Sequence, residues 1–269
     1  MKRLAVIVLF VLLISVLGCA KESSSDRAAD EQRYEPAESD AASEPAKTDS
    51  KYTAPASGSG GMETVDITAD DNTNLAASYY PGNENAVILI HAMNRDRHDW
   101  DGLAKRLDTM GFTVISFDLR GHGESGLNWM DFKDADYRKM VGDVGSVADY
   151  IYTNNDVKIA RTYMVGSSIG ANLAVMYGVT DSKVRRVVML SPGNNYHGLN
   201  PLDALYDFSK PAMIVFSKRD NSANDAYGMK KIGTGERDLV AYDNSQAHGN
   251  EMFKEHPELT QDIIDFINE

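Results

Sequence analysis

The sequence predicts an α/β fold with a mostly parallel sheet of eight strands and helices on both of its faces. From residue 62 onward, short apolar runs alternate with longer stretches whose apolar residues recur at the helical spacing. This alternation is typical of parallel sheets with crossover helices. Two of the runs, residues 87–90 and 187–190, are apolar throughout, as expected for strands that are covered on both faces.

Eight runs are predicted to be strands: Thr64–Thr68, Asn74–Tyr80, Ala86–Ile90, Thr113–Asp118, Ala160–Val165, Arg186–Leu190, Ala212–Ser217 and Asp238–Tyr242. The first two are joined by a turn without a helix, so we expect them to form an antiparallel hairpin at one edge of the sheet. Helical spacing is clearest over residues 100–110, 137–151 and 259–267. We expect about five or six helices in all.

The first residues of the chain have the pattern of an export signal. Lys2 and Arg3 precede an apolar run from Leu4 to Leu17, which is shorter than the about 20 residues needed to span a membrane. This favours a signal peptide, residues 1–18. The stretch 16–20, with Cys19, resembles a bacterial lipobox, which implies cleavage before Cys19 and attachment of lipid to it. An ordinary signal peptide with an incidental cysteine and an uncleaved signal anchor remain the alternatives.

The next segment, residues 19–61, contains no Val, Ile, Leu, Met, Phe or Trp. Such a segment has no large apolar side chains whose burial could offset the conformational entropy lost on ordering. We therefore expect it to be a disordered linker. The remaining residues, 62–269, are predicted to form a single globular domain. A lipid-anchored Cys19, a tether and a globular domain would hold the protein at the cell envelope, outside the cytoplasm.

Charge and cysteine content exclude several classes of partner and site. The formal net charge is −13, and because residues 1–61 carry 7 basic and 9 acidic side chains, −11 of it falls on the domain. An acidic domain repels phosphate backbones, which argues against nucleic acid. The single cysteine, Cys19, allows neither a disulfide nor a cysteine metal site within one chain. No metal-ligand cluster is evident, and we expect neither a cofactor nor a metal. The oligomeric state is left open.

A candidate nucleophile lies in the segment Gly166-Ser167-Ser168-Ile169-Gly170. It follows an apolar strand and begins a helical stretch, which is the context that a G-x-S-x-G motif requires. The turn is so tight that side chains two residues from the nucleophile would collide, which accounts for Gly166 and Gly170. Ser168 is therefore the predicted nucleophile. Ser167 is the rival, but bulky residues would flank it at the positions where the turn needs glycine.

Further motifs resemble those of the α/β-hydrolase superfamily, and the resemblance covers nearly the whole domain. Segment 90–93, with His91, matches the family's histidine-glycine turn after a strand, except that Ala92 replaces the glycine. Segment 118–125 is close to the family's D-x-R-G-H-G-x-S loop, and segment 191–193 is another common feature. The resemblance implies an α/β-hydrolase fold and structural hydrogen bonds for His91 and His122.

The superfamily order of catalytic residues is Ser, then acid, then His. In this order Asp220, just after the strand 212–217, is the implied acid, and His248, after the last strand, is the implied base. Asp225 is the alternative acid, although its position indicates a helix. All of these positions follow the carboxyl ends of strands, where open α/β sheets bind their ligands.

The implied mechanism is acyl transfer through a covalent intermediate on Ser168. The backbone N–H groups of Met93 and Ile169 are the expected oxyanion hole, with the methyl group of Ala92 restricting the approach at Met93. The charged run 94–98 is expected to be a solvated loop that caps the next helix, with contact to the pocket as the alternative.

The substrate class follows from the length of one connection. Only about twenty residues, 191–210, separate two strands at the place where relatives insert a lid, so we expect a minimal cap and an open site. This favours a carboxylesterase that acts on small esters or other acyl substrates, with Tyr196 as a candidate substrate-binding residue. A helix packed on the sheet explains Tyr196 equally well. A peptidase or thioesterase with the same triad, or a catalytically silent envelope-binding lipoprotein, are the alternatives.

Overall fold

The computed structural model describes residues 61–269, so the signal peptide, Cys19 and linker predicted above lie outside the described residues. Within this range eight strands form one sheet: β1 (Glu63–Thr68), β2 (Asn74–Tyr80), β3 (Asn85–Ile90), β4 (Thr113–Phe117), β5 (Arg161–Ser167), β6 (Val184–Leu190), β7 (Ala212–Ser217) and β8 (Arg237–Tyr242). Each predicted strand is confirmed, with ends that differ by two residues at most.

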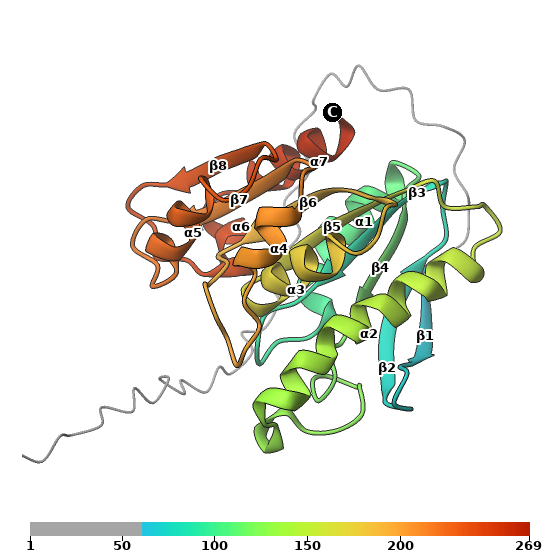
Figure 1. The fold of residues 1–269 in the computed structure, drawn as a ribbon. Helices are drawn as coiled ribbons and strands as arrows, with labels where there is room; N and C mark the ends of the chain where they lie inside the picture. The colour runs from blue at the N-terminus through green and yellow to red at the C-terminus, as the bar shows by residue number, and fades with distance from the viewer. Residues whose placement is uncertain (1–60) are drawn as a thin grey trace, which may run out of the picture. The chain divides into compact units, whose positions relative to one another are not determined.

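The strand order is β1-β2-β4-β3-β5-β6-β7-β8 (Figure 1). Strand β2 pairs antiparallel with both of its neighbours, and all other pairs are parallel. The predicted antiparallel hairpin at one edge is therefore confirmed. The direction of strand addition reverses at β3, because the chain adds β4 on one side of it and β5 on the other. Such a switch point opens a crevice at the carboxyl ends of the two strands.

The described domain also contains seven α-helices and three short 3-10 helices. The α-helices are α1 (Asp101–Thr109), α2 (Asp134–Thr153), α3 (Ile169–Gly178), α4 (Leu202–Asp207), α5 (Ala223–Met229), α6 (Met252–Glu255) and α7 (Leu259–Asn268). The 3-10 helices are η1 (Arg97–Trp100), η2 (Trp129–Asp131) and η3 (Gly249–Glu251). The five or six helices expected from the sequence fall short of this number because α4, α5 and α6 have seven residues or fewer, too short to show a periodic pattern. No helix within residues 61–269 has the length and apolar character needed to cross a bilayer.

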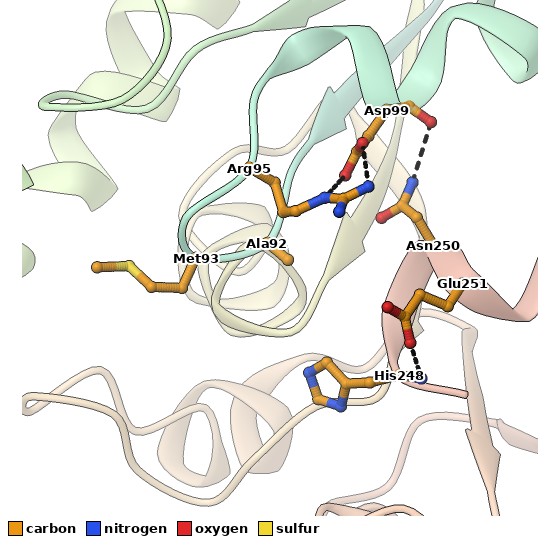
Figure 2. A pocket seen from close by; sticks show the side chains of 7 residues that line it. All are labelled: Ala92, Met93, Arg95, Asp99, His248, Asn250 and Glu251. Carbon is orange, nitrogen blue, oxygen red and sulfur yellow. Dashed lines mark hydrogen bonds and ion pairs between the residues drawn. The ribbon is translucent and has the colours of Figure 1, made fainter. Parts of the chain in front are cut away.

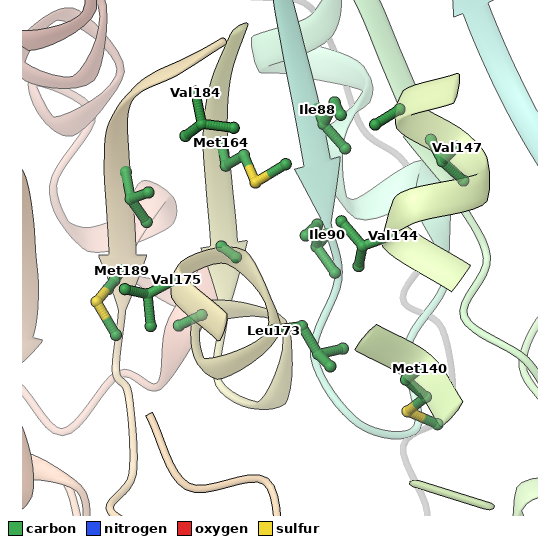
Figure 3. Close-up of a cluster of buried hydrophobic side chains, with 14 of the residues drawn as sticks. Ile88, Ile90, Met140, Val144, Val147, Met164, Leu173, Val175, Val184 and Met189 are labelled. Atoms are coloured by element: carbon green, nitrogen blue, oxygen red, sulfur yellow. The ribbon is translucent and has the colours of Figure 1, made fainter. Parts of the chain in front are cut away.

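The core consists of two layers, one on each face of the sheet. Helices α2, α3, α4 and α5 contribute to one layer, and α1, α6 and α7 contribute to the other. Side chains of the central strands alternate between the layers: Ile88 and Ile90 of β3 face the first, Val87 and Leu89 the second. Figure 3 shows the first layer, where Met140, Val144 and Val147 of α2 lie near β3 and α3. This double coverage explains the uninterrupted apolar runs.

The segment between β6 and β7 is as short as the sequence predicts. It contains the six-residue helix α4 and a single β-bridge between Tyr196 and Leu199. Leu199 and Leu205 are fully buried and belong to the core. The chain thus has an α/β-hydrolase fold with a minimal cap.

Candidate active site

The elbow that carries Ser168 lies between β5 and α3. Ser168 has a φ of 52° and a ψ of −116°, outside the regions that L-residues normally adopt, as is common at functional turns. A Cβ on Gly166 would collide with the carbonyl oxygen of Gly170, and a Cβ on Gly170 would collide with that of Ile90. Glycine is therefore required at both positions, as the motif predicted. The contact at Ile90 also brings the start of α3 against the end of β3.

The two adjacent serines differ in their access to solvent. Ser168 is half-buried, whereas Ser167 is fully buried and its Oγ has no hydrogen-bond partner among the described residues. A Cβ on Gly249 would collide with the Ser167 Oγ, so the loop after β8 packs directly on this hydroxyl. Only Ser168 of the pair is accessible to a substrate.

Asp220 and His248 are in direct contact. His248 Nδ1 lies 2.8 Å from Asp220 Oδ2, and the Ser222 hydroxyl donates to the same oxygen at 2.6 Å. The side chain of Asp220 is 7% exposed and that of His248 is 40% exposed, so the carboxylate is shielded while the imidazole reaches solvent. Burial raises the pKa of Asp220, but hydrogen bonds from His248 and Ser222 outweigh it and hold this pKa below its usual value.

The loops after β7 and β8 are joined by several hydrogen bonds, and these set the distance between Asp220 and His248. The hydroxyls of Ser217 and Ser245 lie 2.9 Å apart. The backbone N–H of Arg219 donates to the carbonyl of Ser245 at 3.1 Å. Because β7 and β8 are parallel neighbours, their carboxyl ends lie at the same edge, and the two loops leave it side by side.

Ser191 connects the His248 loop to the end of β6, a role that the sequence did not reveal. It is buried, has a φ of 48°, and its Oγ accepts a hydrogen bond from the N–H of Gly249 at 3.0 Å. No hydrogen bond joins Ser168 to His248 within residues 61–269. Catalytic hydrogen bonds are often long before substrate binds, and the packing of Gly249 on Ser167 keeps His248 beside the elbow.

His91 fixes the peptide group before Met93. Its Nδ1 lies 2.6 Å from the carbonyl oxygen of Ala92, and its Nε2 accepts from the N–H of Leu119 at 2.9 Å. The proton is therefore on Nδ1. Because C=O and N–H of a trans peptide point in opposite directions, the N–H of Met93 points away from the His91 ring. Burial lowers the pKa of His91 to about 4, so the ring stays neutral.

The other expected donor, the N–H of Ile169, belongs to the first turn of α3. The N–H groups of a first helical turn have no acceptor within the helix, and this end of the helix is the positive end of its dipole. The structure thus brings two donor-bearing segments, after β3 and after β5, to the switch point of the sheet. Their role as oxyanion hole stays a prediction.

The other residues singled out by the sequence, Asp225 and Tyr196, take no part in the contact between Asp220 and His248. Asp225 belongs to α5, as predicted, and accepts from the backbone and side-chain nitrogens of Asn194 at 3.0 Å and 2.7 Å. Tyr196 is half-buried, and its ring lies edge-on to Tyr137 at 5.7 Å, which is a packing role. Within residues 61–269 no group of three or more His, Cys, Asp or Glu side chains could hold a metal ion.

The charged run 94–98 is only partly the solvated loop that was expected. Asp96 does cap η1 through the N–H of His98 at 2.9 Å. Arg97, however, is buried and pairs with Asp118 and, at 2.5 Å, with Glu124. Arg95 lines a cavity beside His248 (Figure 2). The sequence around Arg97 does not reveal this burial, because its two acidic partners lie more than 20 residues later in the chain.

Solved structures with the same fold include several esterases. An esterase of Pyrococcus furiosus has a TM-score of 0.63 and 20% identity, covering 77% of this chain and 90% of that chain. An esterase from Exiguobacterium antarcticum has a TM-score of 0.63 and 15% identity, covering 77% of this chain and 100% of that chain. At these identities the likeness shows the fold alone.

Curated relatives match a shorter stretch. An uncharacterized protein of Mycobacterium tuberculosis is 32% identical over 113 residues, 42% of this chain and 30% of its own length. An AB hydrolase superfamily protein of Bacillus subtilis is 29% identical over 96 residues, 36% of this chain and 32% of its own length. The match therefore spans about a third of the length of these relatives.

A family model covers more than half of the chain. The model described as "Serine aminopeptidase, S33" (Hydrolase_4) matches residues 82–224, a range that includes β3 to β7, Ser168 and Asp220. His248 lies beyond it. Together with the eight-stranded sheet and the elbow, this match makes the chain a member of the Hydrolase_4 family within the α/β-hydrolase superfamily.

Proposed function

We propose that the protein is a serine hydrolase that cleaves carboxylic esters through an acyl-enzyme intermediate. Ser168 is the nucleophile, His248 the general base, and Asp220 the residue that orients His248. The observation that carries the proposal is the 2.8 Å contact between Asp220 and His248, at the sheet edge where the elbow presents Ser168. Membership of a hydrolase family supports the same conclusion.

The reaction proceeds in two steps. In the first, His248 Nε2 takes the proton of Ser168, Oγ attacks the ester carbonyl carbon, and the N–H groups of Met93 and Ile169 bind the negative oxygen. The protonated His248 then gives its proton to the alcohol oxygen as the C–O bond breaks. In the second step water attacks the acyl-enzyme in the same way, which releases the acid and restores Ser168.

The open site favours small or exposed esters. Between β6 and β7 the chain has only one six-residue helix, so no lid covers a long acyl chain. Tyr196 lies in this short segment, and we propose that its exposed part contacts the acyl side of the substrate. Replacing Tyr196 by Ala should then change KM more than kcat.

Labelling with a fluorophosphonate probe tests the nucleophile. The probe should modify the protein at Ser168, as mapped by peptide mass spectrometry. Ser168→Ala should abolish labelling and lower kcat on a small ester by about 10⁴–10⁶, whereas Ser167→Ala should retain both. A folded wild-type protein that neither reacts with the probe nor hydrolyses any ester would instead favour a silent protein that uses the fold for binding.

An aminopeptidase is the second candidate, because the matching family is described by that activity. The same triad can cleave amides, and an aminopeptidase site would in addition bind the free amino group of its substrate. A panel of matched ester, thioester and aminoacyl-anilide substrates separates the possibilities. A kcat/KM for the anilides above that for the esters would assign the protein to peptidases, and a preference for thioesters would assign it to thioesterases.

We further propose that the enzyme acts at the cell envelope, anchored by lipid on Cys19. The support is the sequence alone: a short apolar run that ends just before Cys19, followed by a tether without Val, Ile, Leu, Met, Phe or Trp. Membrane retention would come from the lipid chains, each buried methylene contributing about 0.8 kcal/mol. The mass of the mature N-terminus and fractionation of a Cys19→Ser variant test this. An unmodified Cys19 in membrane-bound protein would instead indicate an uncleaved signal anchor.

A further inference from the structure

We propose that the cavity beside His248 binds the leaving alcohol and selects a small alcohol that carries hydroxyl groups over an alkyl alcohol. The inference rests on the proposed function and names the substrate class of that site. It assigns a binding role to Arg95, Asp99 and Glu251, which the triad does not use.

The cavity has a volume of about 190 Å³ and is formed by two loops that are distant in sequence. Residues of the loop after β3 form one wall, and residues that follow β8 form the other (Figure 2). The lining residues are Ala92, Met93, Arg95, Asp99, His248, Asn250 and Glu251. Asn250 joins the two walls, because its Nδ2 donates to the backbone carbonyl of Asp99 at 3.3 Å.

The position of this cavity assigns it to the alcohol side of the substrate. In the first step His248 must give its proton to the departing alcohol oxygen, so that oxygen has to lie within about 2.6–3.2 Å of the imidazole. The carbonyl oxygen lies at the N–H of Met93 at the same moment. A cavity bounded by both Met93 and His248 therefore receives the group attached to the alcohol oxygen.

Five of the seven lining residues are polar or charged, and hydrogen bonds hold their side chains in place. Arg95 Nε and Nη2 donate to the two carboxylate oxygens of Asp99, both at 2.6 Å, so the pair is closely neutralised. Glu251 Oε2 accepts from the N–H of His248 at 3.4 Å, and its exposed carboxylate keeps acceptor capacity toward the cavity (Figure 2). Hydroxyl groups could both donate to these carboxylates and accept from Arg95.

Other classes of leaving group fit these walls less well. An alkyl group would cover the Arg95–Asp99 pair without replacing its contacts with water, which is costly for charged groups. An anionic group would face the carboxylates of Asp99 and Glu251. The volume of about 190 Å³ is also below the roughly 300–1,000 Å³ typical of sites for larger ligands.

A second cavity of about 240 Å³ adjoins the first and shares Arg95, Asp99 and Asn250 with it. It continues along α1 and α6 past Phe253 and Lys254. This gives a larger polyol, such as a sugar, room to extend beyond the first cavity.

Two esters with the same acyl group test the inference. Ethyl butyrate and glyceryl 1-monobutyrate differ in their alcohol, so the ratio of their kcat/KM values reports on this cavity and does not depend on the fraction of active enzyme. We expect the wild type to favour the glyceryl ester by about 10-fold or more, as expected for one or two hydrogen bonds to charged groups. Equal rates on both esters would overturn the inference while leaving the esterase proposal intact. Hydrolysis of neither would overturn both.

Matched variants locate the effect. Arg95→Met and Glu251→Gln should each lower the ratio by about 3- to 10-fold, and together bring it near one. Arg106→Met and Glu255→Gln make the same changes at exposed positions of α1 and α6 and should leave the ratio unchanged. An unchanged ratio in the two cavity variants would show that the preference arises elsewhere.

Transfer of the acyl group provides an independent measurement. The acyl-enzyme can react with an added alcohol, which gives its proton to His248 and forms the new ester, with Ser168 restored. At equal concentrations glycerol should capture the acyl group more often than ethanol, and Glu251→Gln should reduce this excess. Faster hydrolysis of butyrylcholine than of the glyceryl ester would instead show that Glu251 selects a cationic alcohol, which contradicts the hydroxyl class.

Discussion

His91 Nε2 accepts a hydrogen bond from the backbone N–H of Leu119 at 2.9 Å, and this bond ties the turn after β3 to the turn after β4. The opposite nitrogen of the same ring holds the carbonyl of Ala92. A single buried imidazole therefore sets the orientation of the peptide group that contains the N–H of Met93. His91 touches no substrate, so it is a positioning residue.

Replacing His91 should reduce catalysis by disturbing this peptide. His91→Leu removes both hydrogen bonds and should lower kcat by up to about 10²-fold, the effect of losing one oxyanion-hole donor, with little change in KM. His91→Asn keeps a donor near Ala92 and should retain more of the kcat. Steady-state kinetics and thermal unfolding of both variants separate the roles. Equal losses of kcat in the two variants, in proportion to their Tm, would mean that His91 only stabilises the fold.

Asp220 should be essential and Asp225 dispensable. Asp220→Asn keeps the volume but changes the partner of His248 Nδ1, which lowers kcat by about 10⁴ in a comparable triad. Asp225 bonds to Asn194, so Asp225→Asn should change kcat less than about threefold. Both are measured on a small ester at one pH. A larger loss in Asp225→Asn would reassign the acid.

The free energy of unfolding should fall as the pH drops from 6.5 toward 4. Burial lowers the pKa of both His91 and His122 to about 4, whereas an unfolded histidine titrates near 6.5. Between these values the unfolded chain binds more protons, so acid favours unfolding. The loss is about 2 kcal/mol per histidine at pH 5. Urea unfolding at pH 5, 6 and 7.5 measures it, and His91→Asn should remove about half of this dependence. A flat profile would mean that the two histidines are protonated in the folded protein.

Gly249 and Ser167 should show strong energetic coupling. A Cβ at position 249 would collide with the Ser167 Oγ. The substituted residue would also have to adopt the φ of 56° that Gly249 has. We expect Gly249→Ala to destabilise the protein by about 1–3 kcal/mol from overpacking, in addition to about 1–2 kcal/mol from the left-handed backbone. Ser167→Ala removes a hydroxyl that has no hydrogen-bond partner within residues 61–269, so it should be nearly neutral. In the Ser167→Ala background only the backbone cost should remain, which a double-mutant cycle by urea unfolding detects. Simple additivity would show that the two residues are not in contact.

The apolar patterning of this sequence determined its sheet and the two core layers. Each of the eight runs forms a strand, because a side chain period of two places alternate residues in opposite layers whatever the details of packing. The elbow was equally evident, because the G-x-S-x-G pattern is contained in five consecutive residues. Signals of this kind are local, and a single sequence is enough to interpret them.

Only the tertiary structure decided which residues surround the candidate nucleophile. Ser191 holds Gly249 across 58 residues of sequence, and Asn250 joins Asp99 across 151. From the sequence, Arg97 was expected to be a solvated surface residue. In the fold it is buried and pairs with Asp118 and Glu124. These contacts depend on how strands β3, β6 and β8 are ordered in the sheet, and hydrogen bonds between distant segments leave no periodic pattern in the sequence. A local motif therefore identified the elbow, whereas the walls of the site exist only because the folded sheet brings the ends of distant strands to one edge.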